Sequence, residues 1–139
     1  MHLRLLLGAL PRSEWKKVYR QVYENLQPGG WIEHTEVDME VRSLPAKSLP
    51  EDATLRTYKS TLLAATENAG HASDNTDWMR QEIEDAGFVN VHELDFKMPV
   101  GDWPSHPVWK EAGKLSAILY KVRAFVSPPS FLITYRASY

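Results

Sequence analysis

The sequence predicts an α/β fold in which a few-stranded sheet packs with helices. Segments whose apolar residues recur at spacings of three and four alternate along the chain with segments in which polar and apolar residues alternate one by one. Glycines and prolines separate most of these segments, as expected where the chain turns between elements. The resulting order is helix, strand, two helices, strand, helix and a last strand.

The first third of the chain predicts a short apolar segment, a helix, a tight turn and a strand. Residues 3–8 read as the end of a buried strand or as an apolar loop. Ser13 is the expected N-cap of a helix that ends near Leu26, because its apolar residues have helical spacing. Pro28 and the two glycines after it end this helix and permit the turn into a strand at residues 31–41, where polar and apolar side chains alternate.

The rest of the chain predicts three helices and two strands. Helical spacing is present at residues 52–69 and 77–86, and each of these segments is closed by a glycine. Residues 88–98 are expected to form a strand, in which a one-residue shift of the apolar positions indicates a bulge or a twist. A longer apolar stripe predicts a helix at residues 108–126, and residues 130–139 are expected to form a last strand.

Length, charge and residue counts limit the classes of function to consider. The 139 residues allow one domain with a real core, since 43% of them are hydrophobic. A net charge of -2 gives no electrostatic reason to expect nucleic acid or an anionic membrane as a partner. The chain has no Cys, no histidine spacing typical of a metal site and no apolar run of the roughly 20 residues that span a membrane. We therefore expect a cytoplasmic or nuclear protein without a bound metal.

Ordered motifs carry a resemblance to a known family. A helix leads through "LQPGGWIE", at residues 26–33, into a strand, and a later helix leads through "EDAGFVNV", at residues 84–91, into another strand. Three further matches are "HLR" at residues 2–4, "YENLQPGGWIE" at residues 23–33 and "PVGDWP" at residues 99–104. Together they resemble the C-terminal half of a class I methyltransferase that uses S-adenosylmethionine, of the LaeA type found in fungal secondary metabolism. The resemblance makes the two strands the fifth and sixth of that fold.

The cofactor site of that family has no counterpart in this sequence. The resemblance implies a glycine-rich turn after the first strand that holds S-adenosylmethionine. No G-x-G-x-x-G pattern occurs here, and the adjacent Gly29 and Gly30 follow a helix and open a strand, which is the reverse of the required order. We therefore expect no cofactor-binding residues, and a single domain, residues 1–139, with a partial, truncated Rossmann-like methyltransferase fold.

A truncated sheet of this kind would leave one edge unpaired. Parallel sheets are normally covered on both faces and paired along their middle strands, so a half-sheet exposes backbone hydrogen-bonding groups and apolar surface. A second copy of the chain is the simplest cover, and a separate protein that carries the missing half is the other. We expect a homodimer or, alternatively, a protein partner at this edge.

Three polar residues on one side of the strand at residues 31–41 are the candidate catalytic groups: His34, Glu36 and Asp38. They lie toward the carboxyl end of the strand, where ligands bind in open α/β sheets, and His titrates near neutral pH. Such a set can supply a general base or orient a substrate. The alternative is that these residues form the solvated face of a half-buried strand, which is the commoner meaning of such alternation.

Four residues are candidates for binding a small-molecule substrate. The resemblance places His2 and Arg4 near the cofactor and the substrate, and the alternative is a frayed chain start. Trp103 corresponds by resemblance to a loop that closes over the substrate pocket, and Tyr58 is expected to help line an apolar cavity with it. The alternative for both aromatic residues is a place in the core or in an interface.

These observations leave three hypotheses about function. The first is a methyltransferase-derived protein of natural-product biosynthesis that no longer transfers methyl groups, but binds a small apolar intermediate and promotes its cyclisation or isomerisation. The second is a non-catalytic interaction or regulatory subunit. The third is a methyltransferase that is completed by a cofactor-binding half from elsewhere.

Overall fold

A computed structural model describes residues 1–42, 56–124 and 131–138. The chain divides into two compact units, each of which is described by itself. The first unit comprises Met1–Asp38, Ser60–Asp95 and Tyr135–Tyr139, and the second comprises Met39–Lys59 and Phe96–Thr134.

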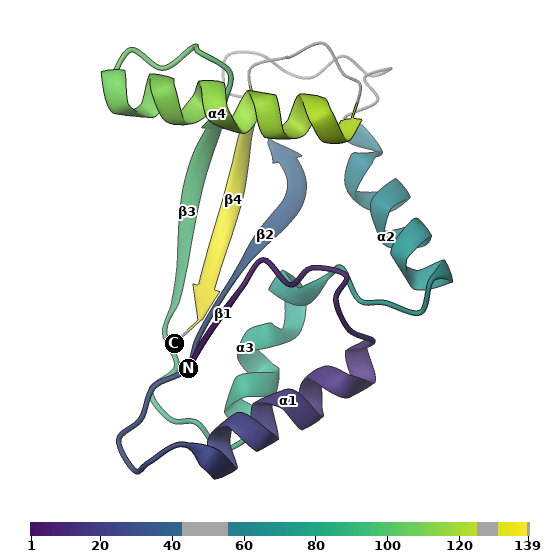
Figure 1. Cartoon of the computed structure of the whole chain (residues 1–139), viewed down its shortest axis with the longest axis vertical. Coiled ribbons are helices and arrows are strands. Elements are labelled where there is room, and N and C mark those ends of the chain that lie inside the picture. The colour runs from purple at the N-terminus through teal and green to yellow at the C-terminus, as the bar shows by residue number, and fades with distance from the viewer. Residues whose placement is uncertain (43–55, 125–130, 139) are drawn as a thin grey trace. The chain divides into compact units, whose positions relative to one another are not determined.

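The described elements alternate between helices and strands. In chain order they are β1 (His2–Arg4), α1 (Arg12–Asn25), β2 (Glu33–Arg42), α2 (Tyr58–Asn68), α3 (Asn75–Asp85), β3 (Glu93–Val100), α4 (Pro107–Ala124) and β4 (Phe131–Ser138), as Figure 1 shows. The strands form one sheet in the order β1-β2-β4-β3. The α/β class and the last strand are therefore confirmed, whereas completion of the fold by dimerisation stays a prediction.

The strand β1 pairs in parallel with β2 at one edge of the sheet. His2 lies opposite Glu33 in the register, and Arg4 lies opposite Thr35. The Glu33 backbone N–H donates to the Met1 carbonyl at 2.9 Å, and the Leu5 N–H donates to the Thr35 carbonyl at 3.0 Å. This pairing fixes the start of the chain beside β2.

The core of the first unit is built from α1, α3 and the start of β2. Helix α1 packs against α3, and the segment before β2 adds Ile32 to the same cluster. The buried apolar residues of this cluster are Trp15, Tyr19, Val22, Ile32, Ala72, Trp78, Met79 and Ile83. Helix α1 therefore presents an aromatic face to the rest of its unit.

The predicted start of α1 and the predicted start of the strand at residues 88–98 are wrong. Pro11, rather than Ser13, is the N-cap of α1, and no side chain caps this helix. Pro11 fits because its backbone is extended and its carbonyl accepts a hydrogen bond from the Glu14 N–H at 3.0 Å. The strand β3 begins at Glu93, and Asn90, which precedes it, has a φ of 58°. The shift of the apolar positions therefore lies in the segment before the strand and does not indicate a bulge within it.

The predicted turn between α1 and β2 is confirmed. Gly29 has a φ of 80°, which favours glycine. A Cβ on Gly30 would lie 2.8 Å from the Gln27 carbonyl oxygen, which accepts a hydrogen bond from the Gly30 N–H. Both glycines are therefore needed to form the turn.

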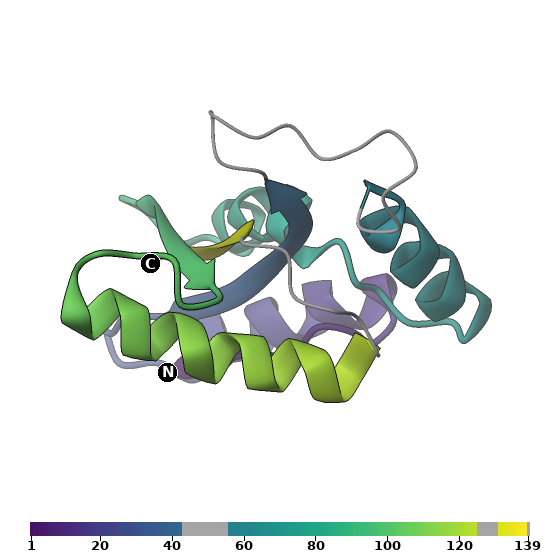
Figure 2. The ribbon, with the colours of Figure 1, turned by 90° about the horizontal axis from the view of Figure 1, so that it is seen from above.

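Replacing Gly113 by Ala is expected to destabilise the second unit. Figure 2 shows α4 as one unbroken helix, and in such a helix Ala is normally preferred to Gly by roughly 1 kcal/mol. Here, however, a Cβ on Gly113 would clash with the backbone carbonyl of Gly101. The N–H of Gly101 donates to the Gly113 carbonyl at 3.0 Å, which holds the two backbones close together. We expect a loss of about 1–3 kcal/mol in the free energy of unfolding.

Urea denaturation measures this loss, with Lys110→Ala on an exposed position of the same helix as the control. The control is expected to change the free energy of unfolding by less than about 0.5 kcal/mol. A Gly113→Ala variant as stable as the wild type would contradict the close packing of α4 on Gly101.

Candidate functional site

The strand β2 buries the polar side chains that the sequence places on one of its sides. The exposed fraction is 0% for His34, 0% for Glu36 and 4% for Asp38. The interpretation of these residues as a solvated face is therefore wrong, because residues of α1 cover this side of β2. Trp31, the first residue of the predicted strand at residues 31–41, lies before β2 and is 67% exposed.

A chain of hydrogen bonds joins α1, β2 and the segment after β1. The hydroxyl of Tyr19 lies 2.7 Å from His34 Nδ1, and His34 Nε2 lies 2.9 Å from Glu36 Oε1. The backbone N–H of Leu6 donates to the same Glu36 oxygen at 2.9 Å. His34 and Glu36 meet because residues two apart in a strand point to the same side.

Burial determines which atoms of this network carry protons. Desolvation, together with the nearby carboxylates of Glu36 and Glu82, raises the pKa of Tyr19 above its ordinary value, so the hydroxyl stays protonated at neutral pH. We assign Tyr19 as the donor to His34 Nδ1, and His34 Nε2–H as the donor to Glu36. This tautomer gives each hydrogen bond one donor and one acceptor.

The second carboxylate oxygen of Glu36, Oε2, is buried and has no hydrogen-bond partner within the described part of the chain. An unpaired buried oxygen is costly, and the cost rises when it carries charge. Both ring nitrogens of His34 already have partners. Glu36 Oε2 is therefore the atom of this pair that is available to a ligand.

Aromatic rings enclose His34 on the α1 side. The ring of Trp15 stacks on the ring of His34, with 5.0 Å between the centroids, and lies 6.2 Å from the ring of Trp78. The guanidinium of Arg12 lies 5.1 Å from the centroid of Trp78. Because Trp15, His34 and Glu36 are fully buried, electrostatic interactions at Glu36 act in a low dielectric.

The other predicted residues of the first unit do not all join this network. His2 Nδ1 lies 3.1 Å from one oxygen of Glu33, and Arg4 Nη2 donates to the other at 2.8 Å. The side chains of His2 and Arg4 are mostly exposed. They anchor β1 to β2 on the surface, whereas Asp38 is buried farther along β2 and has interacting partners of its own.

The Glu33 carboxyl is expected to titrate below the usual range of a glutamate. The hydrogen bond from Arg4 lowers the pKa of Glu33 most, and the nearby charges of Arg4 and His2 also lower it. Because the folded pKa is depressed, the stability from these contacts is present above the unfolded pKa and is lost as the pH falls through the folded value. Nuclear magnetic resonance titration of the side-chain carboxyl measures this pKa.

Arg4→Met is the variant that tests the cause. It should raise the pKa of Glu33 toward its ordinary value, whereas Lys17→Met, which removes a surface ion pair with Glu14, should leave it unchanged. A Glu33 pKa that is the same with and without Arg4 would rule out the proposed contact.

Tyr58 and Trp103 belong to the second unit. Tyr58 begins α2 and is half-buried. Trp103 is also half-buried, and its indole N–H donates to the Val100 carbonyl at 3.2 Å. Their role in binding a substrate stays a prediction.

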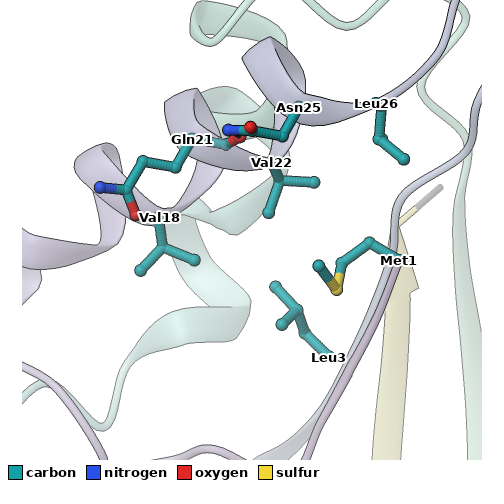
Figure 3. A pocket seen from close by; sticks show the side chains of 7 residues that line it. All are labelled: Met1, Leu3, Val18, Gln21, Val22, Asn25 and Leu26. Atoms are coloured by element: carbon teal, nitrogen blue, oxygen red, sulfur yellow. Dashed lines mark hydrogen bonds between the residues drawn. The ribbon is translucent and has the colours of Figure 1, made fainter.

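An open groove of about 380 Å³ lies between β1 and α1 in the first unit. Figure 3 shows Met1 and Leu3 on one side and the helix residues Val18 and Val22 on the other. A second groove shares Met1 and adds the exposed ring of Trp31. Neither groove is lined by Glu36, so these are surfaces separate from the buried network.

Two glycine turns of the first unit can be compared with the cradle that S-adenosylmethionine requires. The turn that follows β1 contains Gly8, but its N–H donates to the Ala72 carbonyl at 2.8 Å and is not free for a ligand. Gly30, in the other glycine turn, donates its N–H to Gln27. Neither glycine therefore offers a free backbone N–H, and the lack of cofactor-binding residues stays a prediction.

Comparison with known proteins identifies relatives in fungi. The chain is 36% identical over 115 residues to "Secondary metabolism regulator LAE1" of Cochliobolus heterostrophus. The aligned residues cover 82% of this chain and 36% of that protein. It is 33% identical over 118 residues to "Methyltransferase pytC" of Aspergillus terreus, and this alignment covers 85% of this chain and 36% of that protein. The chain is a relative of the LaeA-like methyltransferases. "Probable methyltransferase tdiE" of Emericella nidulans is 28% identical over 102 residues, covering 73% of this chain and 32% of that protein.

The chain matches only part of the length of its LaeA-like relatives. The chain spans about a third of each of these relatives, with 36% of the first and 32% of the last covered. No protein-family profile and no solved structure matches it. Within the described ranges, no helix is long and apolar enough to cross a membrane.

Sequence reasoning missed two residues of this LaeA-like chain that shape the site. Trp15 and Tyr19 lie four residues apart on the apolar face of α1, so helical periodicity identified them only as core. One available signal that the His34 side of the strand is buried was Ile32, an apolar residue two positions before His34 on the same side.

Proposed function

We propose that this chain acts on a small, largely apolar intermediate of secondary metabolism and promotes its cyclisation or isomerisation without transferring a methyl group. The observation that carries the proposal is the buried carboxylate of Glu36, which keeps one unpaired oxygen beside a fully bonded histidine. The name of the relatives called "Secondary metabolism regulator LAE1" supports the setting in secondary metabolism. The bonded N–H groups of Gly8 and Gly30 support chemistry that does not use S-adenosylmethionine.

Each residue of the network has a separate role in the proposed proton transfer. Glu36 Oε2 takes a proton from a C–H or O–H group of the intermediate, and a proton that has exchanged with solvent is delivered to another carbon atom, so the product has the composition of the substrate. His34 does not touch the substrate in this scheme and becomes a positioning residue, because both its nitrogens are occupied. Tyr19 fixes the tautomer of His34.

Incubation of the purified chain with the metabolites of its own gene neighbourhood, without S-adenosylmethionine, tests this proposal. We expect one metabolite to be converted into an isomer of equal mass. Calorimetric titration with S-adenosylmethionine is expected to show no binding. Tight binding of this cofactor by the chain alone would overturn the account of its glycine turns.

A regulatory subunit is the second candidate function, because one set of relatives is named for regulation and the grooves beside β1 are apolar. β1 lies at the sheet edge, and Met1 and Trp31 next to it are 54% and 67% exposed. A two-fold pairing would bring this edge and its groove against the same surface of a second copy. In this second candidate function, the partner that binds the β1 edge is therefore a second copy of the chain.

Size-exclusion chromatography with light scattering tests the homodimer. The wild type should elute as a dimer at micromolar concentration, and Trp31→Ser should shift it toward monomer, whereas Trp109→Ser, in the second unit, should not. A monomeric wild type would remove this candidate and would leave the catalytic proposal untouched.

A further inference from the structure

We propose that two copies of this chain pair β1 with β1 in antiparallel orientation, with Leu3 of each copy on the two-fold axis. This proposal rests on the second candidate function, the homodimer, whose contact surface it specifies, and it is independent of the catalytic proposal. It is carried by the backbone groups of β1, by the side chains on its two faces and by the position of β1 at the edge of the sheet.

Half of the backbone hydrogen-bonding groups of β1 face away from its neighbour β2. The Met1 carbonyl and the Leu5 N–H bond to β2, and the backbone groups of alternate residues in a strand face the same neighbour. The backbone of Leu3 therefore faces β2, whereas His2 and Arg4 direct their N–H and C=O groups to the other side. Because β1 is the outer strand, these four groups have no backbone partner within the described part of the chain. Such an edge is a template for a further strand.

A two-fold register centred on Leu3 uses all four of these groups. When Leu3 lies opposite the partner's Leu3, His2 lies opposite the partner's Arg4, and each such pair exchanges two backbone hydrogen bonds. A register centred on Arg4 would set two guanidinium groups directly opposite each other, which is destabilising. A register centred on His2 would leave the outward groups of Arg4 outside the paired residues of β1. Leu3 is therefore the expected centre.

The side chains of β1 fit this register on both faces of the strand. Leu3 is half-buried and points toward α1, where it lines the groove shown in Figure 3. At the axis it would meet the partner's Leu3, with about 4.5–5.5 Å between the Cβ atoms. On the opposite face, contacts of 3.1 Å and 2.8 Å with Glu33 already order the side chains of His2 and Arg4. The register thus adds an apolar contact on one face and keeps the two guanidinium groups apart on the other.

The groove beside β1 supplies the apolar surface that an interface needs in addition to hydrogen bonds. Its lining includes Met1, Val18 and Val22, and Met1 is 54% exposed. A two-fold axis through Leu3 places this groove next to the same groove of the second copy. Pairing therefore removes apolar surface of both copies from water, which favours association.

Disulfide cross-linking tests this register, because the chain has no Cys and each variant therefore carries a single thiol. In Leu3→Cys the two thiols would lie at the axis. The Cα atoms of such an antiparallel pair are about 4.5 Å apart, which a disulfide can span. Val89→Cys, at a position in the same unit that is 80% exposed, is the control for random collisions. His2→Cys is the control for register, since its two thiols would be offset along the paired strands and too far apart to link.

The full-length variants are treated with oxidised glutathione at micromolar concentration, and the linked dimer is measured on non-reducing gels. We expect Leu3→Cys to link at least about tenfold faster than Val89→Cys or His2→Cys, because pairing raises the effective concentration of its thiols. An equimolar mixture of His2→Cys and Arg4→Cys, which keeps Leu3 in place, should form a mixed disulfide, whereas neither variant should link to itself. This mixture tests the register even if Leu3→Cys does not fold.

The results separate this proposal from the homodimer itself. A wild type that is a dimer by light scattering, while Leu3→Cys links no faster than Val89→Cys and the mixture forms no mixed disulfide, would overturn the β1 pairing and leave the homodimer in place. A monomeric wild type would overturn both. Neither result affects the conversion of a metabolite, which is measured separately.

Discussion

Replacing Glu36 by Gln is expected to lower the turnover of the converted metabolite by about 10²–10⁴-fold, the usual contribution of a general base. The amide oxygen can still accept hydrogen bonds from His34 and Leu6, so the variant keeps the shape and the two contacts of the native side chain. What it loses is the ability to take a proton at Oε2. The rate is measured by product formation under single-metabolite conditions.

Glu24→Gln is the matched control for this prediction. Glu24 lies on the exposed side of α1 in the same unit, and its replacement removes the same charge. Turnover by this control should equal that of the wild type. Equal rates in Glu36→Gln and Glu24→Gln would show that the buried carboxylate has no catalytic role.

Replacing Trp15 by Ala is expected to lower the free energy of unfolding of the first unit by about 3–5 kcal/mol. Trp15 is 0% exposed and contacts Tyr19, His34 and Trp78 with its ring. Its removal leaves a cavity in the centre of the cluster, and a domain of this size has only about 5–15 kcal/mol of stability in total. The variant is therefore expected to lose a large part of this stability.

Urea denaturation followed by circular dichroism measures this loss. Val89→Ala is the control, because it shortens an apolar side chain at an exposed position of the same unit. It should change the free energy of unfolding by about 0.5 kcal/mol or less. A Trp15→Ala variant as stable as Val89→Ala would show that Trp15 is not part of the core.

Local patterns predicted the class of the fold and most of its elements, because amphipathic spacing and glycine turns are decided within short stretches of chain. The helix α1, the turn at Gly29 and the strand β2 all follow from such stretches. The errors occurred where backbone geometry overrode composition. Pro11 caps α1 with its carbonyl, and the positive φ of Asn90 delays β3.

The candidate site could also be predicted only in part, and the reason differs from the one that explains the errors in the fold. The rule of alternation identified His34 and Glu36 as a pair, but it could not tell a solvated polar side from a buried one. That distinction depends on the hydroxyl of Tyr19, which comes from another element and pairs with His34. Contacts between distant segments of this kind leave no periodic signal in the sequence.

The most direct test of Glu36 as a proton-transferring base is mass spectrometry of the product formed in D₂O without S-adenosylmethionine. The account predicts a product of the same composition as the substrate that gains deuterium at one exchanged position. This gain should occur with the wild type and with Glu24→Gln, but not with Glu36→Gln. A product that forms only when S-adenosylmethionine is added and is heavier by one CH₂ group would contradict the account.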